Sequence, residues 1–187
     1  MAIATYDLSR FVRDLRAITA ETGDDRTIMA RVRPLARELA LNRSWLAKRH
    51  YETDEQHGFG VHLLHEEADH TLAVFAASWL PGRGALPHNH LTWAVVAGVV
   101  GPEKNTFWKR LDDGSRPGYA EIRKQGEKVF GPGDVVTLLP DAIHSVINET
   151  GEVTVSLHTY GKHLNHTGRL EFDPEMRTAA PVMRKVQ

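Results

Sequence analysis

From about residue 57 onward, short segments rich in β-forming residues alternate with clusters of turn-forming residues. Such clusters lie at residues 81–84, 112–115 and 131–134, and each contains glycine. Many short strands at regular spacing are typical of a β-sandwich or a β-barrel, because a turn bounds each strand. The pattern predicts a mainly β fold with strands over residues 60–66, 71–79, 93–99, 105–111, 119–123, 135–139, 143–148 and 153–160.

The first 50 residues follow a helical pattern instead. Apolar side chains recur at helix spacing between residues 8 and 18, which predicts an amphipathic helix. Asp24 and Asp25 can cap a second helix, since short acidic side chains accept hydrogen bonds from the free N–H groups at a helix start. Because proline suits the first turn of a helix, Pro34 is expected to begin a further helical piece that runs through Leu41.

The length of 187 residues suits a single domain over residues 1–187. We expect an N-terminal helical segment over 1–50, a β-barrel over 57–172 and a C-terminal tail over 173–187. The tail has no clear periodicity. It is therefore expected to be either a packed arm or a partly disordered end.

Composition and charge exclude several classes of protein. The net charge of −1 gives no electrostatic basis for binding nucleic acid or an acidic membrane surface. No apolar run approaches the roughly 18–20 residues of a membrane span, and acidic residues near the N-terminus stand where a secretory peptide needs an apolar stretch. The absence of cysteine excludes disulfides, thiolate ligands and a cysteine nucleophile. We expect a cytoplasmic protein that is a monomer or, through an exposed sheet edge, a homodimer.

Two histidine-containing segments indicate a metal site. His88 and His90 are two residues apart, so both can project to the same side of a strand. His144 follows a predicted turn and strand, and hairpin geometry would bring it back beside this pair. Because three converging imidazoles can hold one divalent ion, we expect His88, His90 and His144 to be metal ligands.

Both segments are similar to the two motifs of the cupin superfamily: Gly82-x5-His88-x-His90 and Pro140-x3-His144-x3-Asn148. The resemblance implies a double-stranded β-helix, which is a jelly-roll barrel, with a metal near its middle. Many cupins add a glutamate four or five residues after the second histidine, where this chain has Ala94 and Val95. Without that glutamate the ligands are neutral, so the ion keeps its full charge and favours anionic substrate groups such as a thiolate or carboxylate.

A second cluster of polar residues consists of Ser156, His158 and Tyr160, which alternate along one predicted strand and so face the same side. If that side is the barrel interior, the three groups must hydrogen-bond or cost stability. Ser156 would then orient His158, and His158 would orient the Tyr160 hydroxyl toward the metal. With the opposite parity, the three would form a solvent-facing stripe.

A three-histidine cupin followed by Ser-x-His-x-Tyr resembles the thiol dioxygenases, which include cysteine dioxygenase and 3-mercaptopropionate dioxygenase. The similarity runs from about His57 to Arg169. It implies an iron(II) enzyme that uses O2 to oxidise a small thiol carboxylate to a sulfinate, with Ser156, His158 and Tyr160 as catalytic residues. Three histidines alone do not choose the metal, so zinc, nickel or manganese are alternatives to iron.

The resemblance also implies substrate contacts. Mercaptopropionate dioxygenases place a carboxylate-binding arginine nine residues after the tyrosine, where this chain has Arg169. The planar fork of arginine suits a carboxylate. Arg169 is alternatively a surface cation near the tail. His62 aligns with the substrate arginine of cysteine dioxygenases and is either a second substrate contact or an ordinary strand residue, and Trp93 is expected either to wall the pocket or to be an ordinary core residue.

Two other functions stay open at this point. A three-histidine cupin can act on a different small molecule, as a diketone dioxygenase or an isomerase. It can also bind a metal and a ligand without catalysis. The polar Ser156-x-His158-x-Tyr160 strand favours an enzyme, since a simple sensor has less need of such a relay.

Overall fold

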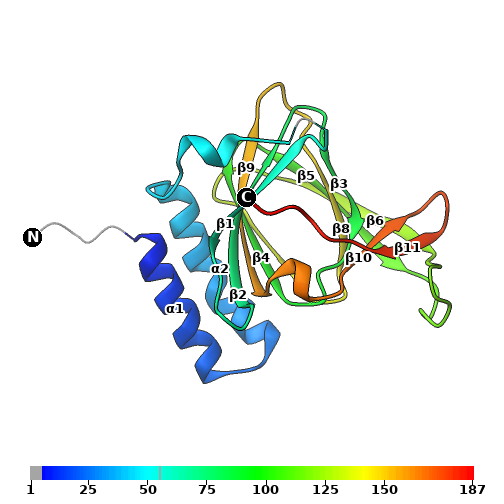
Figure 1. The fold of residues 1–187 in the computed structure, drawn as a ribbon, viewed down its shortest axis with the longest axis horizontal. Helices are drawn as coiled ribbons and strands as arrows, with labels where there is room; N and C mark the ends of the chain where they lie inside the picture. Colours follow the sequence, from blue (N-terminus) through cyan, green and yellow to red (C-terminus); the bar gives the residue numbers. More distant parts are fainter. Residues whose placement is uncertain (1–5, 55) are drawn as a thin grey trace, which may run out of the picture.

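The computed structural model describes residues 6–54 and 56–187 (Figure 1). Two antiparallel sheets face each other and enclose a barrel, with strand orders β1-β2-β9-β4-β7 and β11-β10-β3-β8-β5-β6. The predicted fold, a mainly β double-stranded β-helix with N-terminal α-helices, is confirmed. The strands are β1 (Phe59–His65), β2 (Thr71–Trp79), β3 (Gly84–His88), β4 (Ala94–Val100), β5 (Glu103–Arg110), β6 (Ile122–Phe130), β7 (Val135–Leu138), β8 (Ile143–Ile147), β9 (Thr154–Lys162), β10 (Leu170–Asp173) and β11 (Thr178–Pro181).

Both α-helices begin after an aspartate whose side chain caps the first turn. Asp7 precedes α1 (Leu8–Glu21), and Asp24 precedes α2 (Asp25–Asn42). Each carboxylate accepts a hydrogen bond of 2.8 Å from the backbone N–H three residues further along the chain. These bonds satisfy donors that have no partner within the helix.

Pro34 does not start a new helix, so that prediction is wrong. It lies in the interior of α2, which continues to Asn42. The proline ring removes the hydrogen bond to the carbonyl of Ala30, but both residues are exposed and water can hydrate that carbonyl. The packing of the apolar face of α2 against the barrel holds the helix together across this point.

Most predicted strands are observed within two residues of their predicted ends. The exception is β6, which was expected over residues 119–123 and is found at Ile122–Phe130. It is an edge strand with mostly exposed, charged side chains, so no apolar alternation marks it in the sequence. The short strands β10 and β11 were not predicted either, and β3 was expected only as the strand that carries His88.

The C-terminal tail is a packed arm. β11 pairs with β10 from Leu170↔Pro181 to Asp173↔Thr178. Further on, the backbone N–H of Gln187 donates to the carbonyl of Val61 at 2.8 Å, and its carbonyl accepts from Leu63 N–H at 2.9 Å. The tail therefore runs from the second sheet to the free edge of β1 (Figure 1).

The first sheet is buried on both faces. Its outer face packs against α1 and α2 in an apolar core that includes Leu15, Leu39 and Leu157. Its inner face contributes Phe75, Val96 and other residues to a separate cluster inside the barrel. The helices thus cover one side of the sheet (Figure 1), while the other side lines the barrel interior.

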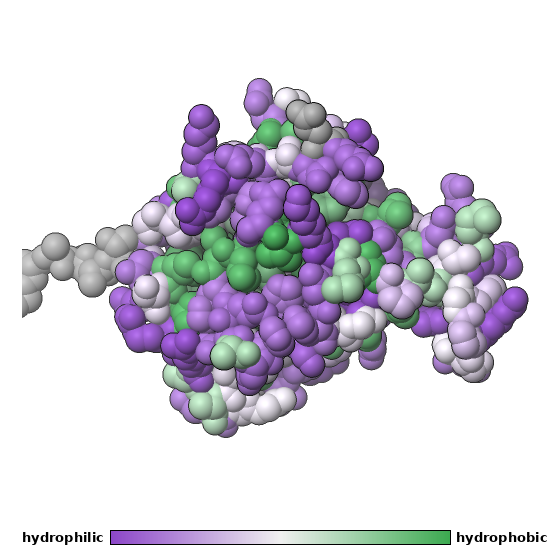
Figure 2. Space-filling model, viewed as in Figure 1, coloured by the Kyte–Doolittle hydropathy of each residue, from purple (hydrophilic) through white to green (hydrophobic). Residues whose placement is uncertain are grey.

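The surface is mixed in polarity. The face shown in Figure 2 is mostly hydrophilic, with one apolar band between α1 and the C-terminal segment. Exposed apolar side chains also occur singly, as at Leu86 and Met176, which is usual for globular proteins. In the described part of the chain, no helix is long and apolar enough to cross a membrane.

Candidate metal centre

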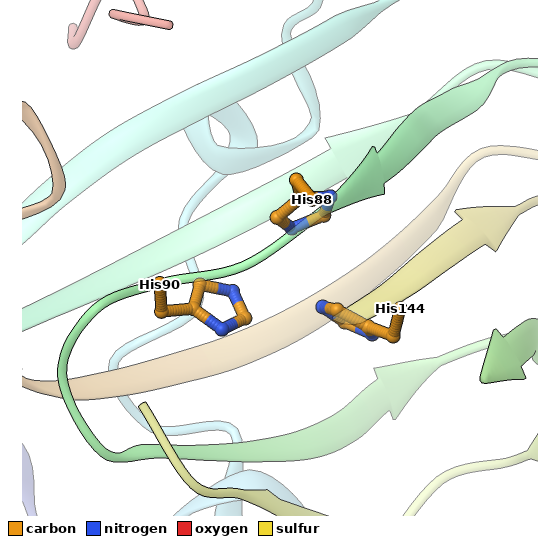
Figure 3. Close-up of side chains that lie close together, drawn as sticks. All are labelled: His88, His90 and His144. Atoms are coloured by element: carbon orange, nitrogen blue, oxygen red, sulfur yellow. The ribbon is translucent and has the colours of Figure 1, made fainter. Parts of the chain in front are cut away.

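Three buried histidines converge inside the barrel (Figure 3). His88, His90 and His144 each place a ring nitrogen within 4.8 Å of the other two. Their ring centroids lie 4.6–5.1 Å apart. Within residues 6–54 and 56–187, no carboxylate joins this group, so the donor set consists of three imidazoles.

The chain turns between the two histidines of the first motif. β3 ends at His88 and His90 lies in the following loop, so the two do not share a strand as expected. Asn89 fixes the turn, because its N–H donates to the carbonyl of Leu170 and its side-chain oxygen accepts from the Leu170 N–H. Leu91 then adopts a left-handed backbone conformation with φ of 53°. The His90 ring reaches the site from this loop.

His144 on β8 pairs directly opposite His88 on β3, which explains how two distant segments bring their rings together. The Nδ1 atom of His88 lies 2.8 Å from the carbonyl oxygen of Leu86, and that of His144 lies 2.9 Å from the side-chain oxygen of Asn105. An oxygen acceptor at Nδ1 places the proton there and leaves the Nε2 lone pair for a metal.

These donors fit a divalent metal ion. The Nε2 atom of His144 and the Nδ1 atom of His90 are buried and have no hydrogen-bond partner among the described residues. Buried nitrogens without a partner cost free energy unless a ligand binds them. Burial lowers the pKa of all three histidines, that of His144 to about 3, so each ring is neutral near pH 7 and can donate a lone pair. The three residues can hold one metal ion, and imidazoles suit several metals.

A cavity opens beside the three histidines. Its empty volume is about 550 Å³, including the part that opens to solvent. Its polar lining residues are His88, His144, His158, Tyr160, Arg169 and Arg184, and the other lining residues are aliphatic or aromatic. A pocket of this kind suits a small molecule with a few polar groups.

Ser156, His158 and Tyr160 face the barrel interior, not solvent, and all three are buried. Ser156 Oγ lies 2.9 Å from His158 Nε2, and His158 Nδ1 lies 2.7 Å from the Tyr160 hydroxyl. The Tyr160 ring packs against His90 with 5.1 Å between centroids, which places this end of the relay beside the metal centre. Burial lowers the pKa of His158 to about 3 and raises that of Tyr160, so both side chains are neutral near pH 7.

Arg169 lies in the turn before β10 and lines the same cavity. It is 5% exposed, and its Nε has no hydrogen-bond partner in the described part of the chain. Nearby Glu171 is instead ion-paired with Arg184 at 2.8 Å. Burial lowers the pKa of Arg169, but a guanidinium keeps its charge. A buried cation of this kind favours an anionic ligand.

Two of the predicted substrate contacts lie away from the cavity. His62 is on the opposite face of β1 from Phe59 and Val61, which line the cavity, and its Nε2 lies 2.9 Å from the carbonyl oxygen of Glu52. Trp93 is packed in the core between the helices and the outer face of the first sheet. A contact with a substrate in this cavity is therefore not available to either side chain, because each points to the far side of its sheet.

Several residues at the site were not found from the sequence. Asn89 and Asn105 orient the metal-ligand loop and His144, and Arg184 lines the cavity from the C-terminal tail. Glu103 is buried on the same strand as Asn105. The polar pair at 103 and 105 is a usable signal, since two polar residues at strand spacing share one face, but the sequence does not tell which face is inside.

A second group of possible ligands lies on the surface and has a poor geometry for a metal. It consists of Glu66, His70 and His166, which are partly or fully exposed. The rings of His70 and His166 are stacked, with 3.6 Å between centroids and 8° between planes. Because a metal must lie close to the plane of each imidazole that binds it, two stacked parallel rings cannot both coordinate one ion.

Fold and site together define a double-stranded β-helix barrel in which three histidines converge. No family model matches the chain. Solved structures with detectable similarity include an oxalate oxidase in complex with glycolate, 13% identical over 63% of this chain and 59% of that chain, with a TM-score of 0.46. A DMSP lyase of Ruegeria pomeroyi is 17% identical over 66% of this chain and 56% of that one, with a TM-score of 0.48. A cupin superfamily protein of Desulfitobacterium hafniense is 15% identical over 59% and 83%, with a TM-score of 0.43.

The chain spans about three fifths of the length of the oxalate oxidases that it matches. Identities of 13–17% concern the fold and do not transfer an activity. The function of this chain therefore has to be inferred from the groups at its own site.

Proposed function

We propose that the protein is a non-haem iron(II) thiol dioxygenase that uses O2 to oxidise a small thiol carboxylate to a sulfinate. One observation carries the proposal: two of the three converging imidazoles, those of His88 and His144, line a single cavity together with Tyr160 of the hydrogen-bonded relay and the buried Arg169 cation. Bound iron(II) would supply the sites for thiol sulfur and dioxygen and the redox chemistry between them. The resemblance of the sequence to thiol dioxygenases supports the same class.

The charges of the site support a substrate with two anionic groups. The imidazoles are neutral and do not compensate a divalent ion, and Arg169 adds a further positive charge to the cavity wall. A thiolate and a carboxylate on one small molecule can meet these two centres together. Cysteine and 3-mercaptopropionate have this combination of groups.

The protein residues bind and orient the substrate. Arg169 would bind the carboxylate through two parallel N–H donors. Tyr160, held by His158 and Ser156, would donate a hydrogen bond to a polar group near the reacting sulfur. The aromatic and aliphatic residues on the remaining walls would limit access of water.

Oxygen uptake by the iron-loaded protein tests the proposal. We expect uptake and a sulfinate product with 3-mercaptopropionate or cysteine. We expect much less with cysteamine, which has a thiol but no carboxylate to pair with Arg169. Replacing Arg169 by glutamine should raise KM for the acid by at least about tenfold, which is a loss of about 1.4 kcal/mol, without lowering iron content. Uptake with a β-diketone and with no thiol would contradict the proposal in favour of a carbon–carbon-cleaving cupin.

A single hydroxyl tests the role of the relay. Tyr160→Phe should retain iron and lower turnover by about 10–100-fold, because the hydroxyl is lost while the ring still packs against His90. Iron content and oxygen uptake measure the two effects separately. Tyr51→Phe is a matched control at a partly exposed site away from the cavity. Unchanged turnover in Tyr160→Phe would remove the tyrosine from the mechanism.

A further inference from the structure

Glu103 is a buried carboxyl that the proposed chemistry does not use. It lies at the start of β5 and is 5% exposed. Its Oε1 has no hydrogen-bond partner within the described residues. Burying a carboxyl costs free energy, most of all in its ionised form, unless partners compensate.

The Glu103 side chain faces the polar side of β9. Its carboxyl lies beside the hydroxyls of Thr154 and Ser156. Ser156 is the first member of the relay that leads through His158 to Tyr160. A continuous row of polar groups therefore runs inside the barrel from Glu103 to the metal centre.

Among the residues that the structure describes, no charged side chain faces the Glu103 carboxyl from the neighbouring strands. The next residue on the strand, Lys104, is ion-paired with the exposed Glu149. On β6, the residue opposite Glu103 is Phe130. On β8 the only titratable side chain is His144, and it is bonded to Asn105.

On β9 the interior-facing titratable groups are His158 and Tyr160, which belong to the relay itself. Burial raises the pKa of Glu103 to about 7, and the hydroxyls of Ser156 and Thr154 oppose that rise in part. The carboxyl can therefore change its protonation state near neutral pH without a neighbouring charge.

We propose that Glu103 is the proton acceptor at the far end of the Tyr160–His158–Ser156 relay and takes up the proton that a thiol substrate loses. This inference rests on the proposed function, because it needs a substrate that loses a proton at the cavity. It assigns Glu103 as a positioning and proton-accepting residue that acts through the relay and does not touch the substrate.

The transfer balances in protons and charge. The S–H bond of the thiol breaks, and its electron pair stays on sulfur. The proton passes to the Tyr160 oxygen while the Tyr160 proton moves to His158 Nδ1. The proton on His158 Nε2 then moves to Ser156, and the Ser156 hydroxyl proton moves to the Glu103 carboxylate. One proton enters the relay and one is added to Glu103, so His158 and Tyr160 stay neutral.

The pH dependence of turnover tests this role. Glu103→Gln keeps the size of the side chain but cannot accept a proton. In the iron-loaded wild type, kcat/KM for 3-mercaptopropionate should rise with pH through about 7, because the carboxylate form is the acceptor. In Glu103→Gln this rise should disappear, and the rate at about pH 8 should fall at least tenfold with unchanged iron content. Glu149→Gln, which removes an exposed carboxyl beside the same strand, should keep the wild-type profile.

A second measurement does not depend on turnover. Infrared difference spectra of the metal-loaded protein without substrate should show a carboxylic acid band that is lost as pH rises through about 7. The band should be absent in Glu103→Gln and should shift in Ser156→Ala, which removes the neighbouring hydroxyl.

The outcomes separate the two proposals. Thiol turnover with the same pH profile in Glu103→Gln and wild type would overturn the role of Glu103 and leave the dioxygenase intact. If the wild-type protein shows no carboxylic acid band that disappears as pH rises, the role of Glu103 is likewise overturned and the dioxygenase proposal is left intact. No oxygen uptake with any thiol would overturn the proposed function, and the proton-accepting role with it.

Discussion

The two faces of β9 are equally buried and chemically opposite. Val155 and Leu157 point toward the helices and lie in the large apolar core. Ser156, His158 and Tyr160 point into the barrel and are joined by hydrogen bonds. One strand thus contributes packing on one side and chemistry on the other.

The difference shows how the fold tolerates a polar interior. Apolar burial against the helices stabilises the first sheet in proportion to the area removed from water. Buried polar groups on the inner face contribute little net stability even when they are paired, and they cost stability when they are not. The helix-side core therefore holds the strand in place, and the inner face is left to position reactive groups.

The largest expected effect is a loss of metal binding when a residue inside the barrel is changed and the apolar core under the helices is left intact. His144→Ala removes one of three metal ligands and should weaken metal binding by at least about 100-fold, and oxygen uptake should be lost with it. Metal analysis and oxygen consumption measure the two effects. His57→Ala, at an exposed histidine, is the matched control and should change neither. A His144→Ala protein that keeps one iron per chain would contradict the three-histidine centre.

The next expected effect is a loss of stability when a residue on the helix-facing side of β9 is changed and the barrel interior is left intact. Leu157 is fully buried against the helices, so Leu157→Ala should lower the free energy of unfolding by about 2–5 kcal/mol and leave the iron content unchanged. Urea denaturation measures the loss. Leu111→Ala, at a side chain that is 44% exposed, should stay within about 0.5 kcal/mol of wild type. Loss of iron without loss of stability in Leu157→Ala would show that the two faces are not separable in this way.

The smallest expected effect is a pH dependence of the free energy of unfolding that arises from Glu103 on the polar side of the sheet. The pKa of Glu103 is raised from an ordinary value of 4.5 to about 7, so the folded state binds a proton that the unfolded state has already released. The stability from this group is fully present below about pH 4.5 and is lost as pH rises through about 7. Between those values, wild type should lose up to about 3 kcal/mol relative to Glu103→Gln. Denaturation curves at about pH 5 and pH 8 measure it, and a pH-independent difference would contradict the assignment.

The barrel was predictable because its strands alternate in polarity or carry β-branched residues between glycine-containing turns. β2 illustrates this, since it is apolar along almost its whole length and was predicted with its observed ends. β6 lacks such a signal because it is an edge strand that faces solvent. Pro34 misled the helix prediction because propensity alone cannot show that solvent will hydrate the freed carbonyl.

The grouping of His88, His90 and His144 was predictable because these histidines follow motif spacing, and Ser156, His158, Tyr160 and Arg169 were found from the resemblance to thiol dioxygenases. The side of the sheet on which each of the other residues lies was not predictable. The strand parity that places Ser156, His158 and Tyr160 inside is fixed by the helices, which cover the other face of β9. For His62 and Trp93 the sequence left two alternatives open, and the structure places both away from the cavity because each is one residue out of phase with the cavity-facing set. Glu103 carries no motif, and only the approach of β5 to β9 brings it to the relay.

The double hydrogen bond between Asn89 and Leu170 has a mechanical consequence. Asn89 lies between His88 and His90, the proposed metal ligands, and Leu170 follows Arg169, so these two hydrogen bonds tie the loop that carries His90 to the segment that carries Arg169. Neither can be displaced without moving the other. Thermodynamic linkage then makes the two binding events reciprocal. If an acid bound at Arg169 raises the affinity for the metal ion by some factor, the bound ion must raise the affinity for the acid by the same factor.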